Sequence, residues 1–309
     1  MRAMILAAGL GTRLRPLTEH TPKPALPVVD VPNIVRTMAH LRRAGITEIV
    51  VNLHHRPEVL RALLGDGAAL GVSIAFSEES PEILGTGGGI LRARSLLGDG
   101  TFCVINGDAL FAPDLEAAVA AHRSSGAIAT MVVRRDPDAE RLGAVGIDGC
   151  NRVRRLVDTG AERADLALHM FTGVHILEPE IFPLLPENGC IVRGAYMPLV
   201  LRGGPLCAHV DRGAFCDLGT PRSYLEANVG LASGRVRIAG YEPPQAGVHV
   251  GEGAILAASC TLGEGTVVER RARVGDGVVL ERCLVRAGAF ADASAADTIF
   301  CADGRRIQV

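Results

Sequence analysis

The sequence predicts an α/β domain built on a mainly parallel sheet, followed by a short parallel β-helix. Three patterns indicate this architecture: a glycine-rich turn directly after an apolar strand at residues 4–8, strands that alternate with helical segments up to about residue 235, and a six-residue repeat beyond that point. A chain of 309 residues is long for one typical domain. We therefore expect two domains, residues 1–235 and residues 236–309.

The elements of the first domain follow from the spacing of apolar residues. Short apolar runs predict strands at residues 49–52, 72–76, 101–105, 127–134, 144–147 and 171–177. Apolar residues spaced three and four apart predict helices at residues 34–44, 57–64 and 223–231, and Pro57 suits a first helical turn. Strands that alternate with helices in this way build a parallel sheet.

The composition is that of an ordinary globular chain, with 48% hydrophobic and 21% charged residues. The net charge is -2, and the chain has three Tyr and no Trp. It therefore lacks the excess of basic residues that binds a phosphate backbone and is poor in aromatic residues on which bases stack, so we expect no nucleic-acid partner. The sequence contains no apolar run of membrane-spanning length and no signal-peptide pattern, so we expect a cytoplasmic protein without a membrane partner. The eight cysteines form no CxxC pair, which favours scattered reduced thiols over a zinc site or a disulfide framework.

The turn after the first strand is suited to binding a polyphosphate. Gly9 and Gly11 leave backbone N–H groups accessible, and Arg13 and Lys23 add fixed positive charge. Spacing excludes two commoner phosphate loops. A dinucleotide-binding fingerprint needs a third glycine where Leu14 stands, and the Gly-Lys-Ser/Thr of a Walker loop does not occur in this turn.

The same segment reads GLGTRLRPLT and is followed by PK at residues 22–23. This pattern resembles the signature of nucleoside-diphosphate-sugar pyrophosphorylases, also called sugar-1-phosphate nucleotidyltransferases. The resemblance implies a Rossmann-like, GT-A-like catalytic domain with a left-handed β-helix, and an enzyme that joins a nucleoside triphosphate to a sugar 1-phosphate. It also implies that Arg13 holds the triphosphate and the leaving pyrophosphate, and that Lys23 bridges the α-phosphate and the sugar phosphate. Arg15 occupies a variable position and is expected to give support only.

Two acidic residues predict a metal site. Asp108 follows the strand at residues 101–105, so its carboxylate lies at the carboxyl end of a parallel strand, where open α/β sheets bind ligands. A hard divalent cation takes one or two carboxylates together with phosphate oxygens, so a partner is needed. Asp217, in the run CDLGTP, matches the family's second acidic motif. We therefore expect Mg²⁺ on Asp108 and Asp217.

The resemblance implies further binding segments. The glycine-rich residues 84–90 are similar to the base-binding segment of the family, and residues 142–145 and 171–174 are similar to the segments that contact the sugar 1-phosphate. The expected nucleotide-binding residues are Ala7, Ala8, Gly9, Gly11, Thr12, Arg13, Glu79, Gly85, Thr86, Gly87, Asn106 and Gly107. The expected sugar-phosphate-binding residues are Lys23, Gly143, Thr172 and Gly173.

One departure from the family pattern bears on the substrate. Many members carry Glu-Lys-Pro where this chain reads LVDTG at residues 156–160, and Arg154, Arg155 and Arg193 are the candidates to replace the missing lysine. The departure points toward relatives that act on mannose, heptose or N-acetylmuramate phosphates. We expect a mannose-1-phosphate guanylyltransferase, with N-acetylmuramate-1-phosphate uridylyltransferase and heptose-1-phosphate guanylyltransferase as alternatives. A catalytically silent regulatory homologue is a further alternative, which the intact catalytic set disfavours.

Histidines give weaker indications. His54 and His55 follow a strand and are expected to form a polar turn, because a sugar phosphate is already ionised and needs no general base. His249 would suit acyl transfer, which some hexapeptide-repeat proteins perform, but no companion motif accompanies it in the sequence.

The six-residue repeat predicts the tail. Its aliphatic positions are Val250, Leu256, Leu262, Val268, Val274 and Leu280, and Gly-Glu-Gly or Gly-Asp-Gly triplets punctuate every second repeat. The period fails after Leu280, so we expect about three coils and a strand-like ending at residues 298–300. So short a stack leaves its ends poorly covered. We therefore expect a structural tail that mediates a homo-oligomer, with a dimer favoured.

Overall fold

The computed structural model describes residues 1–160 and 165–309, which divide into two compact units. The first unit comprises Met1–Leu10, Met38–Gly107 and Pro113–Gly213, and the second comprises Gly11–Thr37, Asp108–Ala112 and Ala214–Val309. The repeat region thus belongs to the same unit as several segments from the N-terminal part of the chain. A functional division at residue 235 stays a prediction.

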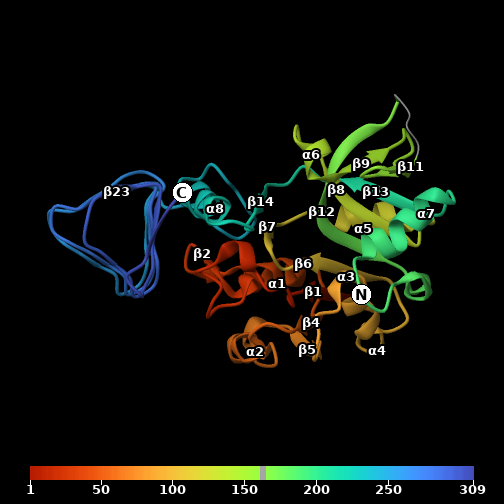
Figure 1. The fold of residues 1–309 in the computed structure, drawn as a ribbon, viewed down its shortest axis with the longest axis horizontal. Helices are drawn as coiled ribbons and strands as arrows, with labels where there is room; N and C mark the ends of the chain where they lie inside the picture. Colours follow the sequence, from red (N-terminus) through yellow and green to blue (C-terminus); the bar gives the residue numbers. More distant parts are fainter. Residues whose placement is uncertain (161–164) are drawn as a thin grey trace. The chain divides into compact units, whose positions relative to one another are not determined.

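The first unit is built on a ten-stranded mixed sheet (Figure 1), in which β8 and β13 extend from β12 beside the main path β11-β10-β9-β12-β6-β1-β4-β5. Strands β6, β1, β4 and β5 are parallel, and β12 is antiparallel to β6, β8 and β9. The strands are β1 Arg2–Leu6, β4 Glu48–Leu53, β5 Ser73–Glu78, β6 Phe102–Asn106, β8 Ala129–Arg134, β9 Ala144–Ile147, β10 Val153–Leu156, β11 Thr159–Gly160, β12 Ala167–Leu177 and β13 Leu206–Val210. Each strand predicted up to residue 177 therefore lies in one sheet.

Helices supply the connections of this unit, as predicted for an α/β fold. They are α2 Pro57–Leu64, α3 Gly85–Arg92, α4 Arg94–Leu97, α5 Leu115–Ser125, α6 Ala139–Gly143 and α7 Met197–Leu201, and α1 Asn33–Arg43 ends in this unit. Met4, Val50, Phe102 and Met131 are buried in its core. Strands that are buried on both faces of a sheet appear in the sequence as continuous apolar runs, and for this reason they could be predicted from the sequence. Among the described residues, the longest apolar helices are too short to cross a membrane.

The second unit carries short elements and one longer helix. Strands β2 Pro27–Val28 and β3 Val31–Pro32 form a hairpin, and β7 Ala109–Phe111 pairs antiparallel with β14 Phe215–Asp217. Helix α8, Pro221–Ala232, begins with a capping box in which the side chains of Thr220 and Ser223 satisfy each other's backbone N–H groups. Pro221 occupies the first helical position, where no N–H partner is needed.

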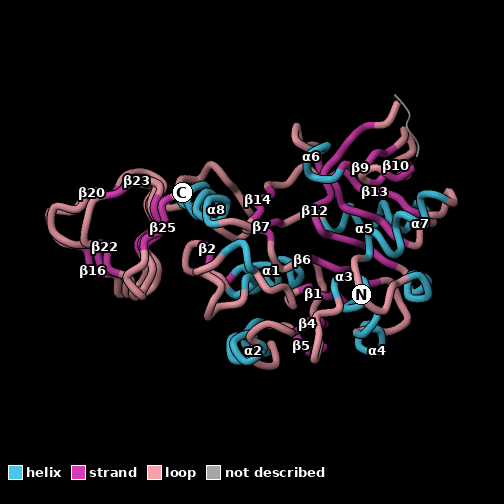
Figure 2. The backbone as a smooth tube through the Cα atoms, viewed as in Figure 1, coloured by secondary structure: helices cyan, strands magenta, loops and turns pink. Residues whose placement is uncertain are grey.

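The tail of the second unit consists of stacked parallel strands in three sheets (Figure 2), consistent with a short left-handed β-helix. Its strands are β15 His249–Val250, β16 Ile255–Leu256, β17 Thr261–Leu262, β18 Val267–Val268, β19 Arg273–Val274, β20 Val279–Glu281, β21 Leu284–Val285, β22 Phe290–Ala291, β23 Ala295–Ala296, β24 Thr298–Phe300 and β25 Arg306–Gln308. The predicted strand at residues 298–300 is β24. The antiparallel β25 covers it.

The coils continue beyond Leu280, where the six-residue period stops. Strand pairing runs from His249 to Val267, Leu284 and Ile299, so successive coils shorten from eighteen to seventeen and then fifteen residues. A shortened coil still stacks on the previous one, but its inward-facing residues no longer follow the six-residue spacing of the sequence. This is why the sequence pattern ended before the structure did.

One face of the tail packs on α8. Val267, Leu284 and Ile299 are fully buried, and they belong to the same hydrophobic cluster as Tyr224 and Leu225 of the helix. The strands on this face read Val-Val, Leu-Val and Ile-Phe, so they are apolar on both sides, as strands buried on both faces are. The hydrophobic core of the second unit is therefore continuous across residue 235.

The first coil is covered on one side only. Its inward-row residues Val250 and Leu256 are 46% and 38% exposed, whereas Val268 and Val274 of the next coil are buried. The homo-oligomer expected from this open end stays a prediction.

We predict that Leu284→Ala lowers the free energy of unfolding by about 3 kcal/mol, because removing a fully buried leucine side chain leaves a cavity between the tail and α8. The measurement is equilibrium urea unfolding of the full chain. Val279→Ala is the matched control: this side chain is 41% exposed on another sheet, and its loss should change stability by less than about 1 kcal/mol. Equal losses in the two variants would contradict the packing of the tail on α8.

Candidate active site

The four residues predicted to carry catalysis all lie in the second unit. Lys23 opens a short 3₁₀ turn, and its Nζ donates a hydrogen bond to Asp108 Oδ2 at 3.0 Å. The lysine side chain is only 7% exposed, whereas that of Asp108 is 46% exposed. The buried ammonium thus has a counter-charge, and the carboxylate keeps an accessible side for a ligand.

Strand pairing brings the two predicted metal-binding carboxylates together. Asp217 is the last residue of β14 and lies directly opposite Ala109 of β7, the residue after Asp108. Opposed residues of an antiparallel ladder have Cα atoms roughly 4.5–5.5 Å apart. Two carboxylates that are far apart in the sequence therefore lie at the same end of one two-stranded ribbon. They supply hard oxygen donors of the kind and number that Mg²⁺ takes when phosphate oxygens and water complete its shell.

Arg13 lies near the same ribbon. A Cβ atom added to Gly219 would stand 2.7 Å from Asp217 Oδ2 and 3.2 Å from Arg13 Nη2. The carboxylate and the guanidinium therefore approach the same glycine, which has no side chain to keep them away. Gly11, at the start of the Arg13 turn, has a φ of 61°, and its carbonyl accepts a hydrogen bond from Thr18 Oγ1 at 2.8 Å. The turn requires glycine at this position because other residues are strained there.

A buried polar network in the first unit connects the phosphate segment to the base segment. Asn52 Oδ1 accepts a hydrogen bond from Ala7 N at 2.6 Å, and Asn52 Nδ2 donates to Glu79 Oε1 at 2.6 Å. The other oxygen of Glu79 accepts from Leu84 N at 2.7 Å. Asn52 and Glu79 are 2% and 1% exposed. Each carboxylate oxygen of Glu79 accepts a hydrogen bond from the chain itself, which holds these segments together; its contact with a nucleotide stays a prediction.

The predicted base-binding segment forms the first turns of α3. Gly87 N donates to Gly189 O at 2.8 Å, and Thr86 Oγ1 accepts from Ile191 N at 3.0 Å. Cβ atoms would clash on this helix: at Gly88 one would stand 2.4 Å from the carbonyl oxygen of Glu187. The glycines therefore allow close packing of this helix. Their contact with a base stays a prediction.

Two of the predicted sugar-phosphate residues, Thr172 and Gly173, are also held from within the first unit. Thr172 Oγ1 donates to Val132 O at 2.7 Å, where β12 bulges. Gly173 has a φ of 79°, and a Cβ there would stand 2.5 Å from Asn106 Nδ2. Asn106 and Gly173, predicted for the nucleotide and the sugar side, are thus neighbours. Gly107 continues from β6 and donates its N–H to Leu6 O at 2.9 Å.

The structure distinguishes the three candidates for the missing lysine. Arg154 Nε donates to Asp148 Oδ2 at 2.8 Å, and Arg155 Nε donates to Val157 O at 3.1 Å. Arg193 is exposed, and within the described residues its guanidinium has no hydrogen-bond partner. It follows Ile191, whose N–H binds Thr86. The guanidinium of Arg193 is therefore available to a ligand, and its contact with a phosphate stays a prediction.

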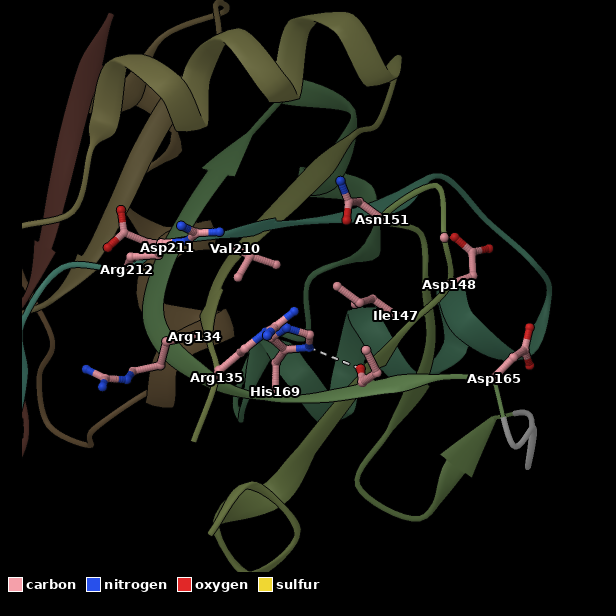
Figure 3. A pocket seen from close by; sticks show the side chains of 12 residues that line it. Arg134, Arg135, Ile147, Asp148, Asn151, Asp165, His169, Val210, Asp211 and Arg212 are labelled. Atoms are coloured by element: carbon pink, nitrogen blue, oxygen red, sulfur yellow. Dashed lines mark hydrogen bonds between the residues drawn. The ribbon is translucent and has the colours of Figure 1, made fainter. Parts of the chain in front are cut away.

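A separate cavity of about 550 Å³ lies in the first unit at the ends of β8 and β13. Figure 3 shows Arg134, Arg135, Arg212 and His169 around it. The Nδ1–H of His169 donates to Ala167 O at 3.0 Å. Burial, together with the charge of Arg135, lowers the pKa of this histidine, so it is neutral at neutral pH. The residues predicted for the active site lie outside the lining of this cavity.

Comparison with known proteins supports the relationship that the motifs indicated. The sequence profile of the family described as Nucleotidyl transferase matches residues 2–234. The chain belongs to the nucleotidyl transferase family. Three relatives in the family illustrate its range. The first is a UTP–glucose-1-phosphate uridylyltransferase of Synechocystis sp., 33% identical over 77% of this chain and 65% of its own length.

The second relative is a mannose-1-phosphate guanylyltransferase of Mycobacterium tuberculosis, 32% identical over 75% of this chain and 65% of its own length. The third is an N-acetylmuramate alpha-1-phosphate uridylyltransferase of Neisseria meningitidis, 37% identical over 74% of this chain and 96% of its own length. The match thus spans just under two thirds of the first two relatives and almost all of the third.

A solved structure from Bacillus anthracis, provisionally assigned as a glucose-1-phosphate thymidylyltransferase, has the same nucleotidyltransferase fold. It is 25% identical, and the superposition has a TM-score of 0.63 over 74% of this chain and 94% of the other.

Asn52 and Gly219 were missed by the sequence reasoning. Asn52 is a polar residue inside an apolar strand run, and that position was the available signal, because a buried amide needs partners. Gly219 lies within the motif that identified Asp217, but its closeness to Arg13 depends on packing that the sequence does not display.

We predict that Asn52→Leu destabilises the protein by about 2–4 kcal/mol, because it leaves Ala7 N–H and one Glu79 oxygen buried without a partner. Equilibrium unfolding measures the loss, and hydrogen exchange at the amides of Ala7 and Leu84 should become faster. Unchanged exchange at both amides would contradict the role given to this network.

Proposed function

We propose that the protein is a sugar-1-phosphate nucleotidyltransferase, which forms a nucleoside-diphosphate sugar and pyrophosphate from a nucleoside triphosphate and a sugar 1-phosphate. One observation carries the proposal: the buried ammonium of Lys23 bonds to Asp108, and strand pairing places Asp217 beside that pair. Cationic groups and hard oxygen donors in one place suit the joining of two polyanions. Membership of the family supports this assignment.

The proposed reaction is an in-line displacement. An ionised oxygen of the sugar 1-phosphate attacks the α-phosphorus, a new P–O bond forms, and the bond to the β-phosphate breaks, so that pyrophosphate leaves with the electron pair. No proton has to be removed from the attacking oxygen. The chain therefore contributes positioning and charge stabilisation. Arg13 would hold the triphosphate and the departing pyrophosphate, and Lys23 would donate to oxygens of the α-phosphate and the sugar phosphate.

Asp108 and Asp217 fit Mg²⁺ by their donor chemistry and their position on one ribbon. Bound Mg²⁺ would neutralise phosphate charge and orient the phosphate oxygens. The exposed side of Asp108 remains available for this role while its Oδ2 accepts from Lys23. Gly219 leaves room for the Asp217 carboxylate to turn toward a ligand.

For the substrates, we propose mannose 1-phosphate with GTP, as the combination of catalytic domain and tail suggests. The second candidate is N-acetylmuramate 1-phosphate with UTP, which is favoured by the 37% identity that extends over 96% of that relative. Heptose 1-phosphate with GTP remains the third. Arg193 would contact the sugar phosphate in place of the missing lysine. The test is to assay a panel of nucleoside triphosphates with a panel of sugar 1-phosphates in the presence of Mg²⁺ and to measure pyrophosphate release. A catalytically silent homologue would release no pyrophosphate.

We propose in addition that the protein works in the cytoplasm. We also propose that it forms a homodimer joined through its tail, because the inward-row residues of the first coil are exposed and a second copy would cover them. Light scattering at micromolar concentration tests the dimer, and a monomer would refute it.

We predict that turnover requires a divalent cation and that Asp217→Asn removes most of it. Asp217 is exposed, so the variant should fold normally, as circular dichroism can verify. Asp108→Asn should also inactivate, but it breaks the bond to Lys23 as well, which makes Asp217 the cleaner test. Full turnover in excess chelator would overturn the metal assignment.

We predict that Lys23→Ala and Arg13→Ala each lower kcat by about a hundredfold or more, because one preorganised charged donor contributes about 3–4 kcal/mol to the transition state. Arg15→Ala should lose far less, since Arg15 occupies a variable position of the motif and a supporting surface charge contributes little. Rates of pyrophosphate release at saturating substrate compare the three variants. The loop assignment fails if Arg15→Ala is the most damaging.

A further inference from the structure

The turn between β2 and β3 is bound by the tail. Asp30, in this turn, accepts a hydrogen bond from His249 Nε2 at 2.7 Å on Oδ2 and from Arg270 N at 2.9 Å on Oδ1. The Arg270 side chain also donates from Nη2 to the backbone oxygen of Asp30 at 2.8 Å. Two coils of the tail therefore hold one carboxylate.

The tail is shaped to accept this carboxylate. A Cβ atom on Gly251 would stand 2.2 Å from Asp30 Oδ2, so only glycine leaves space for it. Burial by itself would raise the pKa of Asp30, but the hydrogen bonds from His249 and from the Arg270 N–H outweigh burial and hold that pKa below its usual value. Asp30 is thus ionised at neutral pH, and each of its carboxylate oxygens accepts a hydrogen bond.

The backbone of the turn is held in an uncommon conformation. Val29 and Asp30 have φ angles of 49° and 62°, a region that strains residues other than glycine. Asn228 Oδ1 accepts from Val29 N at 2.8 Å, and Arg36 Nη2 donates to Val28 O at 2.7 Å. Tyr224 of α8 donates to the carbonyl of Pro27. The surrounding contacts therefore fix a turn that the local sequence would not adopt by itself.

The other end of the hairpin reaches the candidate active site. Lys23 lies in the turn that leads into β2. At the exit of β3, Asn33 N donates to Leu26 O at 3.1 Å, and Asn33 Nδ2 donates to Ala109 O at 2.9 Å. Ala109 follows Asp108 and lies opposite Asp217. The hairpin therefore connects the segment that carries Lys23 to the ribbon that carries both carboxylates.

We propose that Asp30 is a positioning residue: by fixing the β2–β3 turn to the tail, it sets Lys23 relative to Asp108 and Asp217. The tail then contributes to turnover without touching either substrate. The kinetic part of this inference rests on the proposed function, since it concerns the same site. The structural part does not depend on the reaction.

The first experiment compares Asp30→Ala with a matched control in the full-length protein. Arg282→Gln removes the ion pair between Arg282 of the tail and Glu226 of α8, together with the pair between Arg282 and Asp297 within the tail, without touching the hairpin. Misplacing a reacting group by about 1 Å can lower the rate about a hundredfold. We expect Asp30→Ala to lower kcat by about tenfold to a hundredfold, with KM for the triphosphate changed less. Arg282→Gln should stay within about twofold of the wild type. All rates are measured well below the melting temperature of each variant.

A double-mutant cycle then tests whether Asp30 acts through Lys23. If it does, Asp30→Ala should cost little further activity in a Lys23→Ala background, because the group that it positions is already gone. Asp30→Asn, which keeps an oxygen for the Arg270 N–H, should recover part of the rate. Fully multiplicative losses, a kcat for Asp30→Ala equal to the wild type, or an equal loss in Arg282→Gln would each overturn the proposal.

A readout without turnover separates this inference from the proposed function. The Lys23 side chain is 7% exposed and bonded to Asp108, so it should react slowly with acetic anhydride, and mass spectrometry can follow its labelling. We expect several-fold faster labelling of Lys23 in Asp30→Ala and no change in Arg282→Gln. If the wild type releases no pyrophosphate in the substrate panel, the proposed function fails and labelling alone decides. Unchanged labelling in Asp30→Ala would then refute the positioning role.

Discussion

The antiparallel pairing of β7 with β14 is the constraint on which the second unit depends. It places Asp217 opposite Ala109 and so gathers two carboxylates that the chain separates by more than a hundred residues. Negative charges held this close need cations, and the structure supplies the buried ammonium of Lys23 on one side and the guanidinium of Arg13 near Gly219 on the other. Helix α8 and the exit of the hairpin contact this ribbon, and the tail packs on α8. A site for polyanions follows from balancing the charge that one strand pair creates.

The tail is best understood as part of this unit. Val267, Leu284 and Ile299 share a buried cluster with α8, and Asp30 inserts its carboxylate between two coils. The hairpin β2–β3 has strands of only two residues each, and a two-stranded hairpin by itself is at best marginally stable in water. Contacts with the tail, with α8 and with Arg36 supply the missing stability. The repeat region therefore supports the segment that carries Lys23, which explains why the compact unit includes residues from both ends of the chain.

Local patterns in the sequence were sufficient for most of the fold and for part of the site. Apolar runs located the strands, and the motifs around Lys23, Asp108 and Asp217 identified groups that the structure brings together. The partners of the positioning residues could not be found in this way. Asn52 and Asp30 act through partners distant in the sequence, and the turn at Asp30 has a backbone conformation that nothing in Val-Val-Asp-Val demands. No helix was predicted over residues 84–90, because glycine disfavours helices, yet close packing against residues 186–189 requires these glycines in α3.

The same contacts indicate how substrates would be distinguished in the proposed reaction. Three polar side chains of these segments are hydrogen-bonded within the chain. Thr86 accepts from Ile191 N, and Thr172 donates to Val132 O. Glu79 accepts from the Asn52 side chain and from Leu84 N. In the proposed reaction, backbone groups and exposed side chains such as Arg193 would carry part of the discrimination between bases and sugars, and the contacts of Thr86, Thr172 and Glu79 with a substrate stay predictions. Backbone recognition changes little when side chains change, because every residue presents the same N–H and C=O groups. In the proposed reaction, the choice of substrate would then depend on how closely the glycine-lined segments approach it.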